Sequence, residues 1–560
     1  MSQITLKADT EQVPGLSRRF TRIWTFSLGL RKIQRVFIRL ANHRRLSISI
    51  VGISAFVVSA ALSFLVRFPQ PSVHDEFSYL LAADTFAHGR LTNPTHPMWV
   101  HFESMHIIQQ PSYASKYPPA QGLFLAAGKV IGGNPIVGAW LTVALGCSAI
   151  CWMLMGWMPP RWALLGGLLA VSHPLILGWS QSYWGGAVAM SGGALVVGAF
   201  RRLVRAPDAR NAVIMGIGMA VLANSRPYEG LLLCLVLTGA LMYWMRNKDS
   251  PVWRVWLHRV VLPVVLVLTA TVGGMGYYNW RVTGNPLRMP YMVHDATYAV
   301  APSFVWQSRR IEPVYRHKEQ RDFHVGWELP FYEGQRSISG FVFGGVVKVL
   351  VVLIAIFKAV GLVVPMVAIS IAADSNRWIR VLLVSCGLFT VGLIAETFVQ
   401  PHYSAPFIAV IILIALQSMR YLRLWRWRGW RIGRVLFAAS LVMCLVTFVG
   451  FWKDSVLQAR LDEAGWSAQR ARLLEGLRQD GNRHLILVRY APDHSPHNEW
   501  VYNDADIENA KVVWAREMDS TQNQELISYF RDRRVWFLEA DATFPQLSLY
   551  LETTPALVQK

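Results

Sequence analysis

Long apolar runs constrain this chain more than any other feature. Residues 46–66 read LSISIVGISAFVVSAALSFLV, and runs of similar length cover residues 134–156 and 257–278. A helix needs about 20 apolar residues to cross a hydrocarbon core of roughly 30 Å. Inside a bilayer each backbone N–H and C=O must find a partner within the protein, which favours helices for such runs. The pattern therefore predicts a polytopic α-helical membrane protein.

Basic residues set the predicted orientation. The net charge is +21, and the Lys and Arg residues gather in the short gaps between apolar runs. Cytoplasmic loops carry this excess of positive charge, so we expect the lipid bilayer as a partner and no nucleic acid. The basic N-terminus is placed in the cytoplasm and the C-terminus outside. About eleven spans are predicted, near residues 46–66, 134–157, 161–179, 181–201, 210–224, 228–245, 258–279, 350–373, 379–398, 403–420 and 433–452.

Three regions follow from this pattern. Residues 1–45 form a basic cytoplasmic segment with a helix on the membrane surface near residues 22–41. Residues 46–453 form the transmembrane domain. Residues 454–560 form an extracytoplasmic, periplasmic α/β domain, which three strand patterns and one helix pattern indicate. The outer loops cover 67–133 and 280–340, an interfacial helix covers 118–131, the strands cover 483–490, 511–518 and 534–541, and the helix covers 520–533 with Ser520 as its N-cap.

A pair of acids follows the first span at once. Asp75 and Glu76 stand about eight residues beyond the end of that span, in HDEFSYLLAADTFAHG, whose pattern predicts a helix that would hold the pair rigidly. The same loop then carries SKYPPAQG, in which Lys116 precedes two prolines that start the interfacial helix. Acids after a span can be solvated loop residues, but this spacing indicates a site near the membrane surface.

These features resemble the GT-C membrane glycosyltransferases, in particular the protein O-mannosyltransferases and the lipid A aminoarabinose transferases. The resemblance covers the number of spans, the acid pair, the Lys-aromatic-Pro turn, NSRPYEGL (224–231) and QPHYSAP (400–406). It implies an inverting enzyme in the bacterial cytoplasmic (inner) membrane that moves a sugar from a polyprenyl-phosphate carrier to an acceptor on the outer face. The acceptor could be a lipid, a glycan or a protein. Many relatives carry a further acid before the fourth span, where this chain reads GWSQSYWGG without one.

The resemblance assigns roles to single residues. Asp75 is the general base that takes the proton of the acceptor hydroxyl, and Glu76 assists by binding or by tuning its pKa. Lys116 contacts the carrier phosphate. Arg226, Arg281 and Arg288 are further cations for that phosphate, although a snorkelling position at a helix end is the stronger interpretation for Arg281 and Arg288. Residues expected to line the substrate and carrier site are Tyr117, Tyr228, Glu229, His294, His402 and Tyr403.

Other motifs give weaker signals. His101, Glu103 and His106 could bind a divalent metal, but their spacing matches no standard ligand pattern, and no cofactor follows from the sequence. The Asp504-x-Asp506 motif is better explained by a turn.

Two rival functions stay open. A transporter or flippase of lipid-linked sugars would need polar or broken helices in the middle of the bilayer, and a scaffold with a binding α/β tail would not depend on Asp75.

Overall fold

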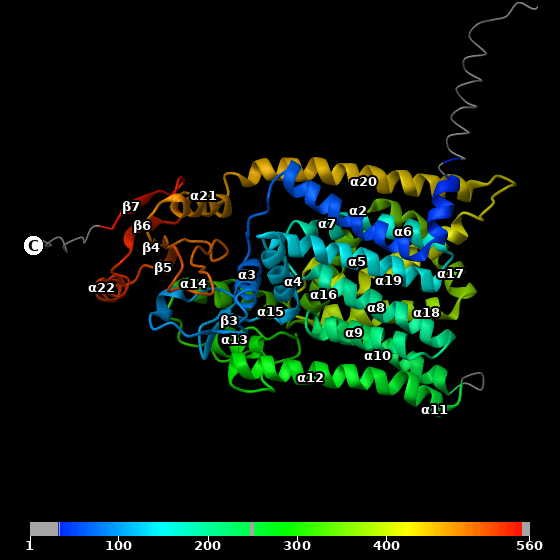
Figure 1. The fold of residues 1–560 in the computed structure, drawn as a ribbon, viewed down its shortest axis with the longest axis horizontal. Coiled ribbons are helices and arrows are strands. Elements are labelled where there is room, and N and C mark those ends of the chain that lie inside the picture. The colour runs from blue at the N-terminus through cyan, green and yellow to red at the C-terminus, as the bar shows by residue number, and fades with distance from the viewer. Residues whose placement is uncertain (1–31, 33, 247–250, 551–560) are drawn as a thin grey trace, which may run out of the picture.

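The computed structural model describes residue 32 and residues 34–246 and 251–550. A helical bundle forms one end of the molecule and a small α/β region forms the other (Figure 1). Within the described residues, nine helices are long and apolar enough to cross a membrane. The predicted class, a polytopic helical membrane protein, is confirmed. The nine are α2 (Arg44–Leu65), α5 (Ile136–Trp157), α8 (Gly186–Arg205), α10 (Pro227–Met245), the run Trp253–Thr283 that ends in α12 (Leu262–Thr283), α16 (Ile338–Ile356), α18 (Arg377–Ala395), the run Pro401–Leu422 that contains α19 (Ala405–Leu422), and α20 (Ile432–Asp462).

The number of spans differs from the predicted eleven. A tenth span exists if α6 (Pro160–Val171) and α7 (Pro174–Ser180) count as one helix bent by 57°. The bend falls at Pro174, which lacks the N–H that would continue the hydrogen-bond ladder of α6. The span predicted at 210–224 is α9 (Ala209–Ala223), whose 15 residues are too few for a full crossing.

One predicted span was placed too late in the chain. The prediction began at residue 350, whereas α16 begins at Ile338, where the Ser337 side chain accepts a hydrogen bond from the backbone N–H of Gly340 at 3.0 Å. The helix therefore includes Lys348. Its ammonium group donates to the carbonyl oxygen of Ile394 at 3.1 Å, which satisfies a charge that the hydropathy pattern disfavours inside a span.

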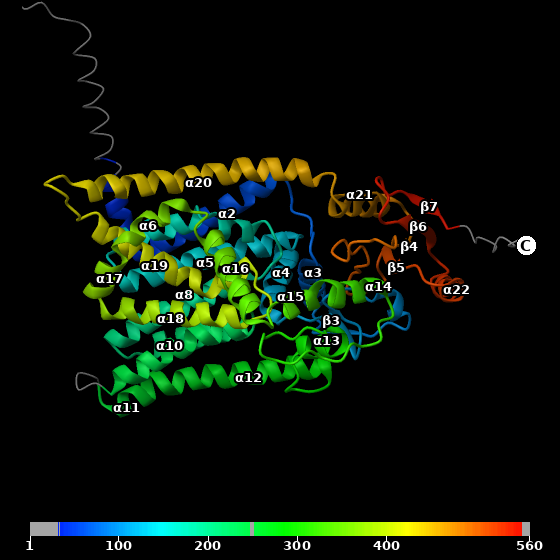
Figure 2. The same ribbon diagram turned by 180° about the vertical axis from the view of Figure 1, so that it is seen from behind.

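The centre of the bundle consists of α5, α8 and α19. More than two thirds of the apolar window of α8 and of α19 is buried, whereas only 11% is buried in α12 and α20, which lie on opposite edges of the bundle (Figures 1 and 2). Close packing in the centre needs small residues. A Cβ on Gly193 of α8 would lie 2.1 Å from the carbonyl oxygen of Pro406, so only glycine allows α8 to approach α19 there.

The N-terminal helix prediction lies mostly outside the described residues. Of the segment predicted at 22–41, residues 34–41 are described and helical. The loop predicted at 67–133 holds α3 (His74–Ala87), β1 (Asn93–Pro94), β2 (Ile107–Ile108), β3 (Ser112–Ser115) and α4 (Pro119–Gly132), with the antiparallel strand order β1-β3-β2. The loop predicted at 280–340 holds α13 (Pro290–Tyr298), α14 (Lys318–Arg321), the short helical turn η3 (Asp322–Glu328) and α15 (Leu329–Gly334).

The C-terminal α/β region contains the predicted strands and helix. Its four strands have the order β5-β4-β6-β7; β5 (Val512–Arg516), β4 (His484–Arg489) and β6 (Arg534–Glu539) run parallel, and β7 (Leu547–Leu549) is antiparallel to β6. Helix α21 (Trp466–Gln479) precedes the sheet and α22 (Ser520–Tyr529) follows β5. The N-cap of α22 is Asp519, whose carboxylate accepts from the N–H of Gln522, and not the predicted Ser520.

This α/β region shares a hydrophobic core with the first loop. Phe77 and Leu81 of α3 pack in one cluster with Leu485 and Leu487 of β4 and with Tyr502. The ring of Phe77 stacks on that of Tyr502 with centroids 4.1 Å apart. Helix α3 thus lies between the membrane bundle and the sheet, and its position depends on both (Figure 1).

Candidate active site

Helix α3 presents its two acids to different neighbours. Glu76 is buried, and its carboxylate accepts hydrogen bonds from the backbone N–H of Ser72 at 2.9 Å and of Tyr183 at 3.0 Å. These bonds tie the start of α3 to the segment after α7. Burial raises the pKa of Glu76 to about 7, although both amides favour the charged form. Glu76 is therefore an anchor of the local backbone.

Asp75 faces a different neighbour, the turn before α4. The hydroxyl of Tyr117 donates to Oδ1 of Asp75, and among the described residues Oδ2 has no hydrogen bond. Burial raises the pKa of Asp75, the positive charges of Lys116 and Arg226 oppose this rise, and the charge of Glu328 adds to it. A half-buried carboxylate with one free oxygen and a raised pKa suits a general base.

Lys116 lies in a turn that three contacts fix. Its backbone N–H donates to the carbonyl oxygen of His106, and the N–H of Tyr117 donates to the hydroxyl of Ser115 at 3.1 Å. At the start of α4 the N–H of Ala120 donates to the carbonyl oxygen of Asn224 at 3.1 Å, which joins this turn to the connection between α9 and α10. The Lys116 ammonium group lies 5.4 Å from the ring centroid of Tyr117, and it has no ion pair with any described residue.

Arg226 forms the second cationic group of the site. It is the N-cap of α10 and its side chain is only 15% exposed. The guanidinium lies 4.3 Å from the ring centroid of Tyr403 and forms an ion pair with Glu229 at 3.7 Å. His402 packs against Trp184 with ring centroids 4.6 Å apart. The segments NSRPYEGL (224–231) and QPHYSAP (400–406) thus meet beside Asp75, although they lie far apart in the sequence.

Three further residues predicted to line the site have well-defined positions. Tyr228 points its hydroxyl toward the carbonyl oxygen of Gly392 at 3.4 Å and its ring toward Phe304. His294 on α13 is buried, with its ring centroid 5.8 Å from that of His106. Tyr117 contacts Asp75 directly. The loop that contains α13 therefore reaches the same place as α3.

The other predicted cations are exposed. Arg281 donates to the hydroxyl of Tyr277 at 3.2 Å on the surface of α12, and Arg288 lies exposed in the connection that follows. Neither has a contact with Asp75 or Lys116 among the interactions of the described residues. Their positions agree with the snorkelling interpretation.

The predicted metal candidates have separate partners. Nδ1 of His101 lies 3.0 Å from the carbonyl oxygen of Arg516. Glu103 accepts a hydrogen bond from the Tyr298 hydroxyl at 2.7 Å and pairs with Arg316 at 3.5 Å. His106 faces other rings. Within the described part of the chain, no group of three or more His, Cys, Asp or Glu side chains could hold a metal ion.

Several residues near Asp75 were missed in the sequence. His74 precedes the acid pair and was given no role, and His324, Glu328 and Asp295 lie in the long second loop. His324 and Glu328 are four residues apart, and Nδ1 of His324 lies 2.6 Å from Oε2 of Glu328. That spacing was the only local signal for them. The charge of Glu328 acts on Asp75, so the second loop supplies a further acid to this neighbourhood.

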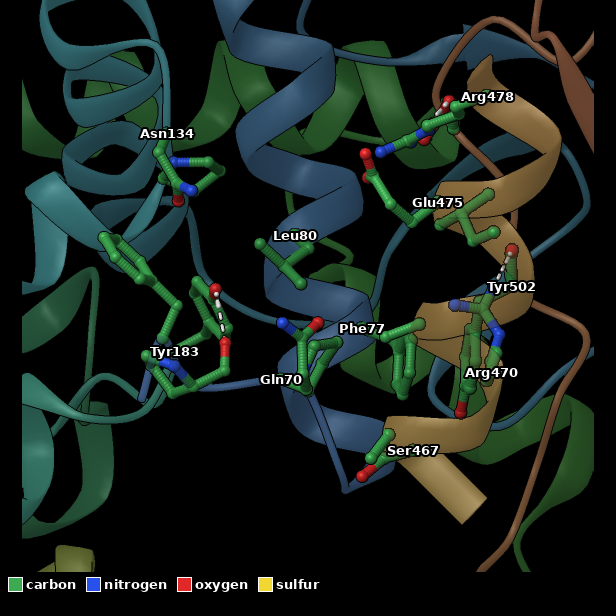
Figure 3. A pocket seen from close by; sticks show the side chains of 18 of the residues that line it. Gln70, Phe77, Leu80, Asn134, Tyr183, Ser467, Arg470, Glu475, Arg478 and Tyr502 are labelled. Carbon is green, nitrogen blue, oxygen red and sulfur yellow. Dashed lines mark hydrogen bonds and ion pairs between the residues drawn. The ribbon is translucent and has the colours of Figure 1, made fainter. Parts of the chain in front are cut away.

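A large cavity lies on the other face of α3. Its volume is about 710 Å³, and Phe77 and Leu80 of α3 form its floor between α21 and the start of α5 (Figure 3). Two of its charged side chains have partners of their own: Lys129 pairs with Asp84, and Arg470 donates to the carbonyl oxygen of Trp500. Other lining residues include Gln70, Asn134, Tyr183, Ser467, Glu475 and Arg478.

Comparisons with known proteins give a fold match without a sequence match. No protein-family model and no curated protein sequence matches the chain. The crystal structure of ArnT from Cupriavidus metallidurans in the apo state has 13% sequence identity and a TM-score of 0.51, over 86% of this chain and 92% of ArnT. ArnT bound to undecaprenyl phosphate gives 15% identity and a TM-score of 0.51, over 88% and 92% of the two chains.

A further similar structure is the oligosaccharyltransferase of Archaeoglobus fulgidus in complex with Zn and sulfate. It has 12% identity and a TM-score of 0.48, over 87% of this chain and 67% of that chain. Identities this low show the fold alone. The predicted resemblance is confirmed at that level: the chain has the fold of the ArnT structures, and it joins a multi-pass helical membrane domain to an α/β region.

Proposed function

We propose that the protein is a GT-C glycosyltransferase that moves a sugar from a polyprenyl-phosphate carrier to an acceptor hydroxyl. The observation that carries this proposal is Asp75, a half-buried carboxylate with a free oxygen between the cations Lys116 and Arg226. The likeness to ArnT, one structure of which is bound to undecaprenyl phosphate, supports a lipid-phosphate donor.

The arrangement supports a single-displacement reaction. Asp75 takes the proton of the acceptor hydroxyl as its oxygen attacks the anomeric carbon. A bond forms from that carbon to the acceptor oxygen while the bond from the carbon to the phosphate oxygen breaks, with inversion. Lys116 and Arg226 stabilise the charge that grows on the leaving phosphate. The proton stays on Asp75 until the product leaves.

The site also suggests where the reaction occurs. Asp75, Lys116 and Arg226 all lie at the end of the bundle that carries the α/β region, near the ends of apolar helices. The lipid tail of a donor would stay in the bilayer while its phosphate reached this level. With the N-terminus in the cytoplasm, this end faces outward, so we place the enzyme in the cytoplasmic membrane with its site on the outer face.

The proposal is tested by Asp75→Asn in reconstituted proteoliposomes. A panel of radiolabelled polyprenyl-phosphate sugars serves as donor, and label is followed into lipid, glycan and protein fractions of the native envelope. Asparagine keeps the size and hydrogen bonding of aspartate but is a far weaker base, so we expect transfer to fall by about a hundred- to ten-thousandfold. Asp504→Asn, an exposed acid of the α/β region, is the matched control and should transfer at the parent rate. Parent-like transfer by Asp75→Asn would exclude Asp75 as the base.

A further inference from the structure

Four buried imidazoles form a continuous chain beside Asp75. They come from α3 (His74), from the turn before β2 (His106), from α13 (His294) and from η3 (His324), and none is more than 8% exposed. Ring centroids are 5.6 Å apart for His74 and His106, 5.8 Å for His106 and His294, and 5.9 Å for His294 and His324. We call these four residues the imidazole chain.

Most ring nitrogens of the imidazole chain have no hydrogen bond to any described residue. These are Nε2 of His74, Nδ1 of His106, both nitrogens of His294 and Nε2 of His324. Buried polar atoms in native proteins are almost always hydrogen-bonded, and each one left without a partner destabilises the fold. Several such atoms in one cluster of neighbouring rings indicate a polar ligand.

The existing hydrogen bonds restrict what two of these nitrogens can do. Nδ1 of His324 lies 2.6 Å from the Glu328 carboxylate, which only accepts when ionised, so Nδ1 carries the proton. Nε2 of neutral His324 then has a lone pair and no proton. Nδ1 of His74 lies 2.9 Å from the Tyr502 hydroxyl. To donate a hydrogen bond to an anion from Nε2, His324 must first gain a proton.

The positive charge of Lys116 acts on the imidazole chain and is not balanced by any described acid in an ion pair. The ammonium group of Lys116 has no ion pair among the described residues, and with burial it lowers the pKa of His74 and of His294, each to about 3, and that of His106. Acids lie at the edges: Asp295 is 3.7 Å from His294 and is shared with Arg310. The other titratable groups around the chain are Asp75, Tyr117, Tyr298, Tyr315, Glu328, His497 and Tyr502.

We propose that the imidazole chain and Lys116 together bind the phosphate of the polyprenyl carrier, and that the chain takes up a proton when this phosphate binds. This inference rests on the proposed function and specifies how its donor and product are held. Transfer turns a phosphodiester with one charge into a phosphomonoester whose second ionisation lies near pH 6. An imidazolium beside it supplies a charge-assisted donor for the added negative charge. Burial and the charge of Lys116 lower the pKa of His74, His106 and His294, so these three are neutral before binding, and the arriving anion reverses that balance.

The sign of the pH dependence follows from proton uptake. If the bound state holds one more proton than the free state, affinity falls as pH rises through the pKa of the bound imidazole, by up to about tenfold per pH unit. The phosphate could also take up the proton itself. Histidine variants of the imidazole chain distinguish protonation of an imidazole from protonation of the phosphate, because a proton on the phosphate does not require a histidine.

The experiment titrates the full-length protein in detergent with undecaprenyl phosphate between pH 6 and 8.5. Calorimetry in buffers of different ionisation enthalpy counts the protons taken up. We expect about one proton per carrier bound, and we expect His294→Gln and His324→Gln to bind about ten- to a hundredfold more weakly at pH 6.5, with little pH dependence. His88→Gln removes an exposed histidine that directly follows the end of helix α3 and should behave as the parent. Melting curves and gel filtration verify that each variant is folded.

Two results would overturn the inference in different ways. In the first, both folded glutamine variants keep the affinity and the proton uptake of the parent, which would mean that the imidazole chain does not bind the phosphate. If Lys116→Ala still weakens binding in that case, the proposed function stays in place. If the parent protein binds no undecaprenyl phosphate at any pH, the inference and the proposed lipid-phosphate donor both fail.

Discussion

Asp75 and Glu76 are adjacent in the sequence but have different surroundings in the structure. Asp75 contacts a tyrosine hydroxyl and lies near two cations, whereas Glu76 accepts from two backbone amides. The same acid pair thus supplies one group for chemistry and one for the position of the helix. Adjacent residues on a helix point about 100° apart, which is why the pair divides in this way.

Glu76→Gln tests this division. Glutamine has one carbonyl oxygen, so it loses one of the two amide hydrogen bonds and leaves a buried donor unpaired. We expect the free energy of unfolding to fall by roughly 1–3 kcal/mol, seen as a lower melting temperature in detergent, with a smaller loss of transfer than for Asp75→Asn. Loss of all transfer at a parent-like melting temperature would instead give Glu76 a part in the chemistry.

Lys116→Ala tests the cation at the leaving phosphate. Its charge-assisted contact in a poorly hydrated place is worth roughly 1.5–3 kcal/mol, so use of the lipid donor should fall about ten- to a hundredfold. Arg288→Ala, which removes an exposed cation of the second loop, is the matched control and should leave donor use unchanged. Equal losses in the two variants would point to a general effect of net charge on lipid recruitment.

The pH profile of transfer tests the state of Asp75. The base must be ionised, so kcat/KM should be lost as pH falls through the raised pKa of Asp75, at a higher pH than for an ordinary aspartate near 3.9. Lys116 and Arg226 favour the ionised form. Removing either cation should therefore move the acid limb of the profile to still higher pH, while Arg288→Ala should not move it. An acid limb that shifts downward in Lys116→Ala would contradict this assignment.

Local patterns predicted part of the site from the sequence. Asp75, Lys116 and Arg226 were found because each stands in a short motif at the end of an apolar run. Arg281 and Arg288 fit the same description, and only the packing shows that they are exposed. His324 and Glu328 were missed because nearly 250 residues and several spans separate them from α3, and no periodicity in an irregular loop indicates where it folds back.

At the scale of elements, α3 joins the two parts of the molecule. One face carries Asp75 toward the α4 turn, and the other carries Phe77 and Leu81 into the core of the α/β region. Strand patterns predicted that region as a domain of its own. Its core is incomplete without the first loop, so we expect it to depend on α3 for stability.

Phe77→Ala tests this dependence. Phe77 is 7% exposed and stacks on Tyr502, and truncation of a buried phenylalanine costs about 3–5 kcal/mol. We expect the α/β region to become sensitive to limited proteolysis at temperatures where the parent resists. Phe544→Ala removes a phenylalanine that is 79% exposed and should have no such effect. Unchanged proteolysis of Phe77→Ala would show that the α/β region folds independently of α3.

Spans were easier to predict than their ends. Runs of apolar residues gave most helices within a few positions, because a helix in lipid needs continuous apolar length. The exceptions have local causes: Lys348 is paired inside α16, Pro174 divides one run into two helices, and α9 is short. Hydropathy does not show that α9 is too short to cross or that α6 and α7 are bent at Pro174, so the count of spans came out higher than the nine or ten that the described residues support.

At the scale of the whole molecule, orientation in the membrane decides on which side the site lies. In a background without the five native cysteines, single cysteines at positions 90, 480 and 205 report it. We expect an impermeant thiol reagent to label positions 90 and 480 in intact spheroplasts and to leave position 205 unlabelled, because the basic segment at 200–210 is predicted to be cytoplasmic. Permeabilised cells provide the control for position 205. Labelling of 205 with protection of 90 would invert the topology and remove the outer-face site.

The central claim is that a lipid phosphate lies beside Asp75, and its position is best measured directly. A cryo-EM structure of the full-length protein in nanodiscs with undecaprenyl phosphate would locate it. We predict density for the phosphate within hydrogen-bond distance of the Lys116 ammonium group and next to the free oxygen of Asp75, with the lipid chain leading into the bilayer. Phosphate density in the cavity between α3 and α21, with none near Lys116 at saturating ligand, would contradict the account.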